Sequence, residues 1–75
     1  MAEQTDELKV LGSVIQKLRV ERGLTSEALA KRASLSSTRL EQIEHGEAEA
    51  RIMEVARLAK ALDVTTQLLC ERARL

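Results

Sequence analysis

The spacing of its apolar residues constrains the fold of this chain more than any other feature of the sequence. Apolar residues recur at helical spacing, and residues that typically begin and end helices separate the groups. The first group follows the three- and four-residue steps of an amphipathic helix: Leu8, Leu11, Ile15 and Leu18. Gly23 follows the pattern closely, and glycine commonly adopts the left-handed conformation that ends a helix. The sequence therefore predicts a first helix that ends at about Arg22.

Hydroxyl-bearing residues mark where three further helices begin. Thr25, Ser36 and Thr65 each precede a helix-forming segment, where a side-chain oxygen accepts a hydrogen bond from a first-turn N–H group. Together with a fourth helix after the loop at residues 46–50, the expected helices cover residues 25–33, 36–45, 51–62 and 65–72. The fourth helix is expected to bury Ile52, Val55, Ala56, Leu58, Ala59 and Leu62. Short connections between five helices predict an all-α, compact five-helix bundle that forms one domain over residues 1–75.

The composition removes the usual supports of a small domain. A chain of 75 residues buries only about 60% of the surface that it exposes when unfolded. Phe, Tyr and Trp are absent, and the chain has one cysteine, Cys70, and one histidine, His45. One thiol cannot form a disulfide within a monomer, and a zinc site needs three or four suitable ligands. We therefore expect an aliphatic core without a disulfide or a bound metal.

The same inventory argues against an enzyme. The sequence has no glycine-rich phosphate loop and no pair of acids in a plausible cleft, so we expect no catalytic residue, cofactor or small-molecule ligand. The longest apolar runs contain three residues, which excludes a membrane span in this sequence. The acidic start differs from a targeting segment, and the expected location is the cytoplasm.

Charge is unevenly distributed, although the net charge is zero. Residues 17–39 carry six Lys and Arg against two Glu, whereas residues 40–54 carry five Glu against one Arg. The basic block is the candidate surface for binding an anion such as nucleic acid. Alternating charges on helices are also typical of a solvated surface, so charge alone leaves both interpretations open.

The second and third predicted helices are separated by only about three residues. Such a connection suits two helices that cross at about 90–120°, as in a helix-turn-helix. Ala30 would then lie at the crossing, and Leu40 and Ile43 would be buried. The third helix would expose a polar row suited to base edges in a major groove: Ser37, Thr38, Glu41 and Gln42, with Arg39 beside them. Ordinary exposed polar residues would give the same pattern.

From Leu11 to Leu69 the chain resembles the Cro and lambda-repressor-like (XRE) family of helix-turn-helix regulators. Four segments carry the resemblance: LRVERGLT at 18–25, LA at 29–30, LEQIEHG at 40–46 and LAKALDV at 58–64. The resemblance implies a lambda-repressor-like fold with the helix-turn-helix at about residues 25–45. It also implies a sequence-specific DNA-binding transcriptional regulator, such as a repressor, that binds the major groove of double-stranded DNA.

The resemblance assigns roles to individual residues. The family's base-contacting positions fall on Ser36, Ser37, Thr38 and Gln42, and an amide such as that of Gln42 can pair with adenine. The candidates for contacts with DNA phosphates are Ser26, Arg39 and Arg51. Arg19 and Glu44 match a pair that forms a structural salt bridge between the first and third helices of the family.

Two departures from the family bear on function. Ser34 stands in the turn where relatives commonly have Gly, so a left-handed backbone there would be mildly strained. The loop after the third helix carries Glu47 and Glu49 where relatives often carry Lys or Arg, and these charges would repel DNA phosphates. An alternative function is therefore a protein-binding helix-turn-helix module, such as an antitoxin or adaptor, with a protein partner and weak or no DNA binding.

Apolar residues near the C-terminus predict a homodimer. The candidate interface lies within residues 62–75 and consists of Val64, Leu68, Leu69 and Leu75, which offer more apolar surface than one small core needs. Two recognition helices about one turn of DNA apart would contact a pseudo-palindromic operator. In the other interpretation, Leu68 and Leu69 simply cover the core of the monomer.

Overall fold

Helix α1 (Ala2–Glu21) is the longest helix of the fold. The structure is a computed structural model that describes residues 2–73, with side chains from residue 7 onward. Within this range, α1 is followed by α2 (Ser26–Arg32), α3 (Ser37–Glu44), α4 (Ile52–Ala61) and α5 (Thr66–Ala73). The predicted order of five helices and the all-α class are confirmed. Leu75 lies outside the described residues.

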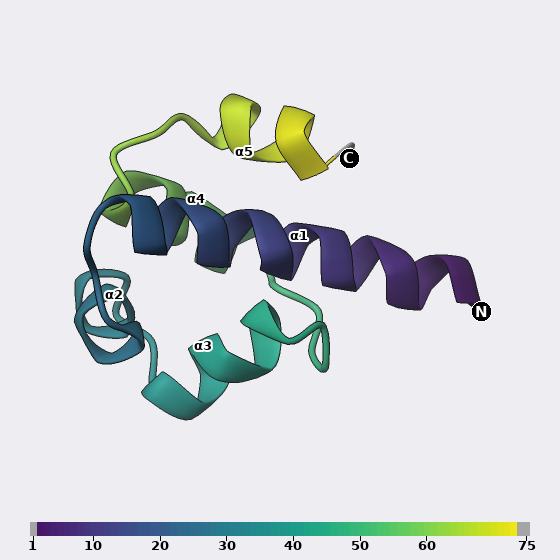
Figure 1. Ribbon diagram of the computed structural model, residues 1–75, viewed down its shortest axis with the longest axis horizontal. Helices are drawn as coiled ribbons and strands as arrows, with labels where there is room; N and C mark the ends of the chain where they lie inside the picture. Colours follow the sequence, from purple (N-terminus) through teal and green to yellow (C-terminus); the bar gives the residue numbers. More distant parts are fainter. Residues whose placement is uncertain (1, 74–75) are drawn as a thin grey trace.

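The helices lie on several sides of α1 (Figure 1). Helix α5 follows one side of α1, and α2 and α3 lie on the opposite side. Contacts join α1 to α3 and α5, α2 to α3 and α4, and α4 to α5. The recognition-helix candidate, α3, is therefore supported by α1 and α2, and α2 is supported in turn by α4.

The helix ends form where the sequence predicts them. The hydroxyl groups of Thr25, Ser36 and Thr65 accept hydrogen bonds from backbone N–H groups three residues later, at 3.1, 3.0 and 3.0 Å. Gly23 and Gly46 follow α1 and α3 with φ of +67° and +72°, the left-handed conformation that glycine adopts without a steric penalty. These contacts are local, which is why the sequence predicts them well.

Aliphatic side chains from all five helices and their ends form the core. The buried set is Leu11, Ile15, Leu18, Leu29, Ala30, Ala33, Leu40, Ile43, Val55, Leu58, Ala59, Leu62, Leu69 and Ala73. Two predicted core positions of α4 are not buried, because Ile52 is 81% exposed and Ala56 is half-buried. Ile52 is the first residue of α4, and the apolar face of that helix is covered only from Val55 onward. None of the helices in residues 2–73 is long and apolar enough to cross a membrane.

Candidate nucleic-acid interface

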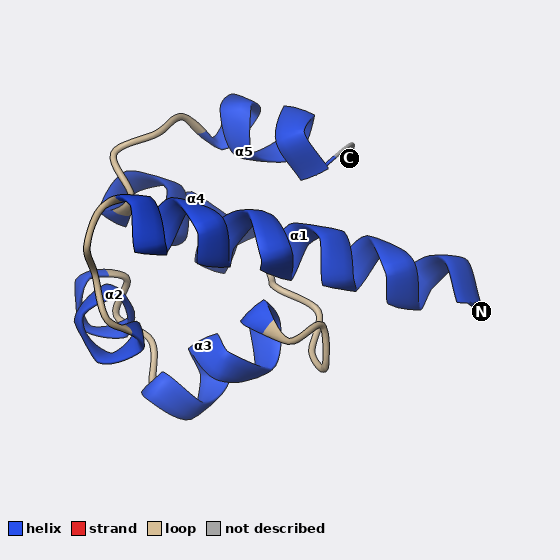
Figure 2. Cartoon of the chain, in the orientation of Figure 1, coloured by secondary structure: helices blue, strands red, loops and turns tan. Residues whose placement is uncertain are grey.

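Helices α2 and α3 form a helix-turn-helix around a short turn. The Leu35 N–H donates to the Ala30 carbonyl at 2.8 Å, and Ser34 adopts the left-handed conformation with φ of +58°. Ala30, a small residue of α2, is 2% exposed, and α2 packs against α3. Figure 2 shows α2 nearly end-on, with α3 running across from it. The expected turn is present, with serine in the conformation that favours glycine.

Helix α3 separates its polar and apolar residues onto different faces. Leu40 and Ile43 are 0% and 1% exposed and belong to the core. The four candidate base-contacting residues lie on the other faces or at the helix start: Ser36, Thr38 and Gln42 are exposed, and Ser37 is half-buried. The structure therefore presents this polar row to the solvent, as the interpretation of α3 as a recognition helix requires.

An ion pair joins α1 to the C-terminal end of α3. Nε of Arg19 donates to Oε2 of Glu44 at 2.8 Å, and Nη2 donates to Oε1 at 3.3 Å. Nη1 of Arg19 also donates to the Leu24 carbonyl at 2.9 Å. The two side chains are only 13% and 3% exposed. The pair that the family resemblance implies is therefore present, in a two-bond geometry that fixes orientation as well as distance.

A second ion pair joins α3 to α4, and sequence reasoning missed it. Nε and Nη2 of Arg39 donate to Oε2 and Oε1 of Glu54 at 3.0 and 2.8 Å. The Arg39 guanidinium, aided by the backbone N–H of Arg51, lowers the pKa of Glu54 to about 2 against the opposing effect of burial. The same pair raises the pKa of Arg39. Arg39, expected to contact phosphate, thus has an internal partner fifteen residues away, which no local sequence signal identifies.

Two glycines allow α1 to approach the end of α3 closely. A Cβ atom on Gly12 would clash with the backbone carbonyl oxygens of Ile43 and Glu44. A Cβ atom on Gly46 would clash with the side chain of Lys9 and crowd its backbone. Gly12 was not among the predicted site residues, although a lone glycine inside a helical pattern is a known signal of close packing.

The remaining phosphate candidates lie at helix starts. Ser26 is the first residue of α2 and is half-buried. Arg51 is exposed at the start of α4, and its backbone N–H donates to Oε1 of Glu54 at 2.8 Å. Between α3 and Arg51, the exposed Glu47 and Glu49 give the connecting loop its negative charge. The basic Arg51 and the acidic Glu47 and Glu49 therefore lie close in sequence, just after the candidate recognition helix.

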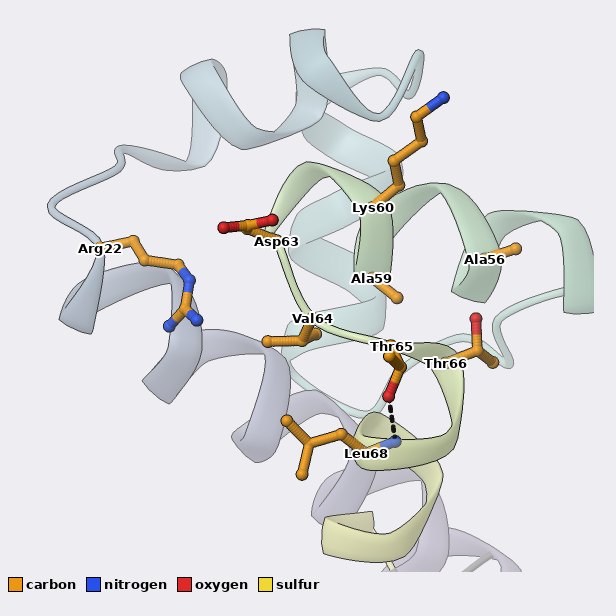
Figure 3. A pocket seen from close by; sticks show the side chains of 9 residues that line it. All are labelled: Arg22, Ala56, Ala59, Lys60, Asp63, Val64, Thr65, Thr66 and Leu68. Carbon is orange, nitrogen blue, oxygen red and sulfur yellow. Dashed lines mark hydrogen bonds between the residues drawn. The ribbon is translucent and has the colours of Figure 1, made fainter.

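The predicted dimer residues do not form one surface. Leu69 is 0% exposed and packs in the core of its own chain, so its assignment to an interface is wrong. Leu69 lies on the side of α5 that faces the other helices. Leu68, the residue before it, is half-buried. Val64 and Leu68 line an open hollow of about 690 Å³ at the junction of α4 and α5, together with Arg22 and Asp63 (Figure 3).

Comparisons with solved structures give the same fold. The restriction-modification controller C.AhdI from Aeromonas hydrophila is 29% identical, with a TM-score of 0.81 over 83% of this chain and 94% of that one. The wild-type restriction-modification controller C.Esp1396I is 29% identical, with a TM-score of 0.82 over 91% and 88%. The clp gene regulator ClgR from Corynebacterium glutamicum is 24% identical and similar in fold, with a TM-score of 0.86 over 91% and 72%.

The family assignment comes from the sequence. Comparison with curated protein sequences found no significant match. The helix-turn-helix family model HTH_3, in contrast, matches residues 15–69, which include α2, α3, α4 and the Arg19–Glu44 pair. This match covers more than half of the chain and agrees with the observed turn geometry. The chain therefore belongs to the HTH_3 family of XRE-type helix-turn-helix proteins.

Proposed function

We propose that this protein is a transcriptional regulator that binds a pseudo-palindromic operator in double-stranded DNA as a homodimer. The observation that carries the proposal is the exposure of Thr38 and Gln42 on α3, with Ser36 just before the helix, opposite a buried apolar face. Ion pairs to α1 and α4 hold this helix in a fixed orientation. Hydroxyl and amide groups on a fixed helix suit the donors and acceptors of a major groove.

The similarity to two restriction-modification controllers supports a regulatory role. In the proposed complex, Gln42 and the hydroxyl groups contact base edges, while Ser26 and Arg51 contact phosphates. The backbone N–H groups at the start of α2 favour an anion there, because they carry the positive end of the helix dipole. The proposal includes no catalytic step.

A homodimer is proposed because α3 has only eight residues and contacts few base pairs. Two copies related by a twofold axis would place two such helices about one DNA turn apart. Val64 and Leu68 remain candidates for this contact, because both line the hollow between α4 and α5. Sedimentation equilibrium at micromolar concentration tests the dimer, and a mass that stays near 8.3 kDa with and without operator DNA would contradict it.

The second candidate function, a protein-binding module, is favoured by a different surface. Glu47 and Glu49 are exposed, and Ile52 and Met53 just beyond them are 81% and 63% exposed. An acidic loop next to two large apolar side chains suits a protein partner better than it suits DNA phosphates.

Two experiments test the DNA-binding proposal. The first selects bound sequences from a random double-stranded DNA library, and the second titrates the protein with the selected sequence at several salt concentrations. We expect a selected pseudo-palindrome and a logarithm of affinity that falls linearly with the logarithm of salt concentration. No enrichment and no saturable binding at low salt would contradict the proposal and favour the protein-binding module.

A further inference from the structure

The Arg39 side chain holds two separate groups beyond its own helix. Its Nε and Nη2 atoms donate to both carboxylate oxygens of Glu54 at 3.0 and 2.8 Å. Nη2 also donates to the backbone carbonyl of Glu49 at 2.8 Å. One guanidinium of α3 therefore binds the first turn of α4 and the end of the loop between the two helices.

That acidic loop, residues 46–50, is attached to α3 at its other end as well. The N–H groups of Glu47 and Ala48 both donate to the Gln42 carbonyl, at 2.8 and 3.3 Å. Where the loop enters α4, the Arg51 N–H donates to Oε1 of Glu54 at 2.8 Å. The loop thus runs from the backbone of Gln42 to the Arg39–Glu54 pair, with polar contacts at both ends.

We propose that Arg39 is a positioning residue that fixes the acidic loop and α4 against the recognition helix, and that it does not contact a DNA phosphate. This inference rests on the proposed DNA-binding function for its effect on specificity. Its structural part, the attachment of the loop by Arg39 and Glu54, does not depend on DNA.

The charge balance around Glu54 supports this role. The Glu54 side chain is 7% exposed, and its two oxygens accept hydrogen bonds from Arg39 and from the Arg51 backbone. Withdrawing the guanidinium toward a phosphate would leave a buried carboxylate without its cation, which is unfavourable. A guanidinium that is already paired with a carboxylate also contributes little net positive charge toward DNA.

The pair also affects the position of two repulsive charges. Glu47 donates its backbone N–H to the Gln42 carbonyl, and Glu49 accepts a hydrogen bond from Arg39 through its backbone carbonyl. The bonds that fix the loop therefore also fix where these two carboxylates lie relative to α3. Because the Arg39–Glu54 pair joins α4 to α3, its loss would also loosen the orientation of the candidate base-contacting residues. The expected consequence is lower discrimination between operator and random DNA.

Four variants of the intact protein distinguish positioning from phosphate contact. Arg39→Gln and Glu54→Gln each remove the ion pair. Arg39→Lys keeps the positive charge but cannot form the bidentate pair with the carboxylate. The fourth variant combines Arg39→Gln with Glu54→Gln. We expect each single variant to reduce the ratio of operator to random-DNA affinity by about tenfold, and the double variant to be no worse, because the residues act as one unit. The salt dependence should stay unchanged in Arg39→Gln and in the double variant, because neither loses a phosphate contact.

Matched controls calibrate the salt dependence. Arg51→Gln removes one proposed phosphate contact from each half of the dimer and should reduce the slope of log affinity against log salt by about 1.8. Lys17→Gln removes an exposed cation on α1, beside Arg72 of α5, and should leave the slope unchanged. A slope reduced in Arg39→Gln but not in Glu54→Gln, or an Arg39→Lys variant that matches the wild type, would overturn the proposal.

Amide hydrogen exchange supplies a measurement without DNA. Exchange at Glu47 and Ala48, whose N–H groups donate to the Gln42 carbonyl, should become faster in Arg39→Gln and Glu54→Gln but not in Lys17→Gln. Unchanged exchange in both pair variants would overturn the attachment of the loop. If the wild type binds no DNA while exchange responds as expected, the proposed function fails and the structural role of Arg39 stands.

Discussion

The guanidinium of Arg19 binds both carboxylate oxygens of Glu44, at 2.8 and 3.3 Å, and so connects the last turn of α1 to the C-terminal end of α3. The same end of α3 packs against Gly12, where the absence of a side chain lets the helices approach closely. The Arg39–Glu54 pair joins the first turn of α3 to α4. Helix α3 is therefore held by one ion pair in its first turn and another in its last turn. The orientation of the polar row depends on these contacts.

Removing the carboxylate of Glu44 should destabilise the fold. Glu44→Ala leaves Arg19, 13% exposed, without its anion, and we expect a loss of about 3 kcal/mol in the free energy of unfolding. Urea denaturation measures the change. Glu41→Ala is the matched control, because Glu41 is an exposed glutamate on the same helix. Equal midpoints for the two variants would contradict a structural role for the pair.

Gly12→Ala should also destabilise the protein, although alanine is intrinsically the better helix former. Helix propensity alone favours alanine by about 1 kcal/mol. The added methyl group would clash with the carbonyl oxygens of Ile43 and Glu44, and we expect a net loss of about 1–3 kcal/mol. Ser13→Ala, at an exposed position next to it, should be neutral or slightly stabilising. A stabilised Gly12→Ala variant in thermal denaturation would refute this packing.

Acid should weaken the contact between α3 and α4. The pKa of Glu54 is lowered to about 2 from an ordinary value of 4.5, mainly by Arg39. Its contribution to stability is therefore complete above about pH 4.5 and is lost as the pH falls toward 2. Urea denaturation of the wild type and Glu54→Gln should show a stability difference that is constant near neutral pH and shrinks between pH 4.5 and 2. A difference that does not change over this range would contradict the assigned pKa.

Gln42→Ala should reduce specific binding and leave random-DNA binding nearly unchanged. Loss of a bidentate amide contact with a base costs about 1–3 kcal/mol at one position of each half-site. Fluorescence anisotropy with operator variants measures this loss. Gln67→Ala is the control, because Gln67 is also an exposed glutamine but lies on α5. Equal losses on operator and random DNA for Gln42→Ala would mean that Gln42 does not contact a base.

Reversing the charge of the acidic loop should strengthen DNA binding and reduce its selectivity. Replacing Glu47 and Glu49 by Lys turns two charges that repel phosphates into two that attract them, and the gain should shrink as salt rises. Glu21→Lys combined with Glu71→Lys makes the same change in net charge at exposed positions on α1 and α5. If both double variants bind equally at low salt, the loop lies away from the DNA.

Local sequence accounts for the helices, their ends and the helix-turn-helix. Thr25, Ser36 and Thr65 bind N–H groups only three residues away, and Gly23 and Gly46 adopt the left-handed conformation next to the helices that they end. Such interactions depend on neighbouring residues, so a short stretch of sequence contains all the information that they need. The Arg19–Glu44 pair, in contrast, could be predicted only through the family resemblance.

The packing of the helices, in contrast, sets which side chains remain exposed and free to bind a partner. Arg39 has the local sequence of an exposed basic residue, and its pairing with Glu54 arises because α4 returns to the start of α3. Leu68 and Leu69 are equally apolar, but only the packing of α5 makes Leu69 fully buried. Ile52 fits the apolar period of α4 and is nevertheless exposed. In each case the outcome depends on groups that are distant in sequence and brought together by helix packing, which a periodic pattern does not encode.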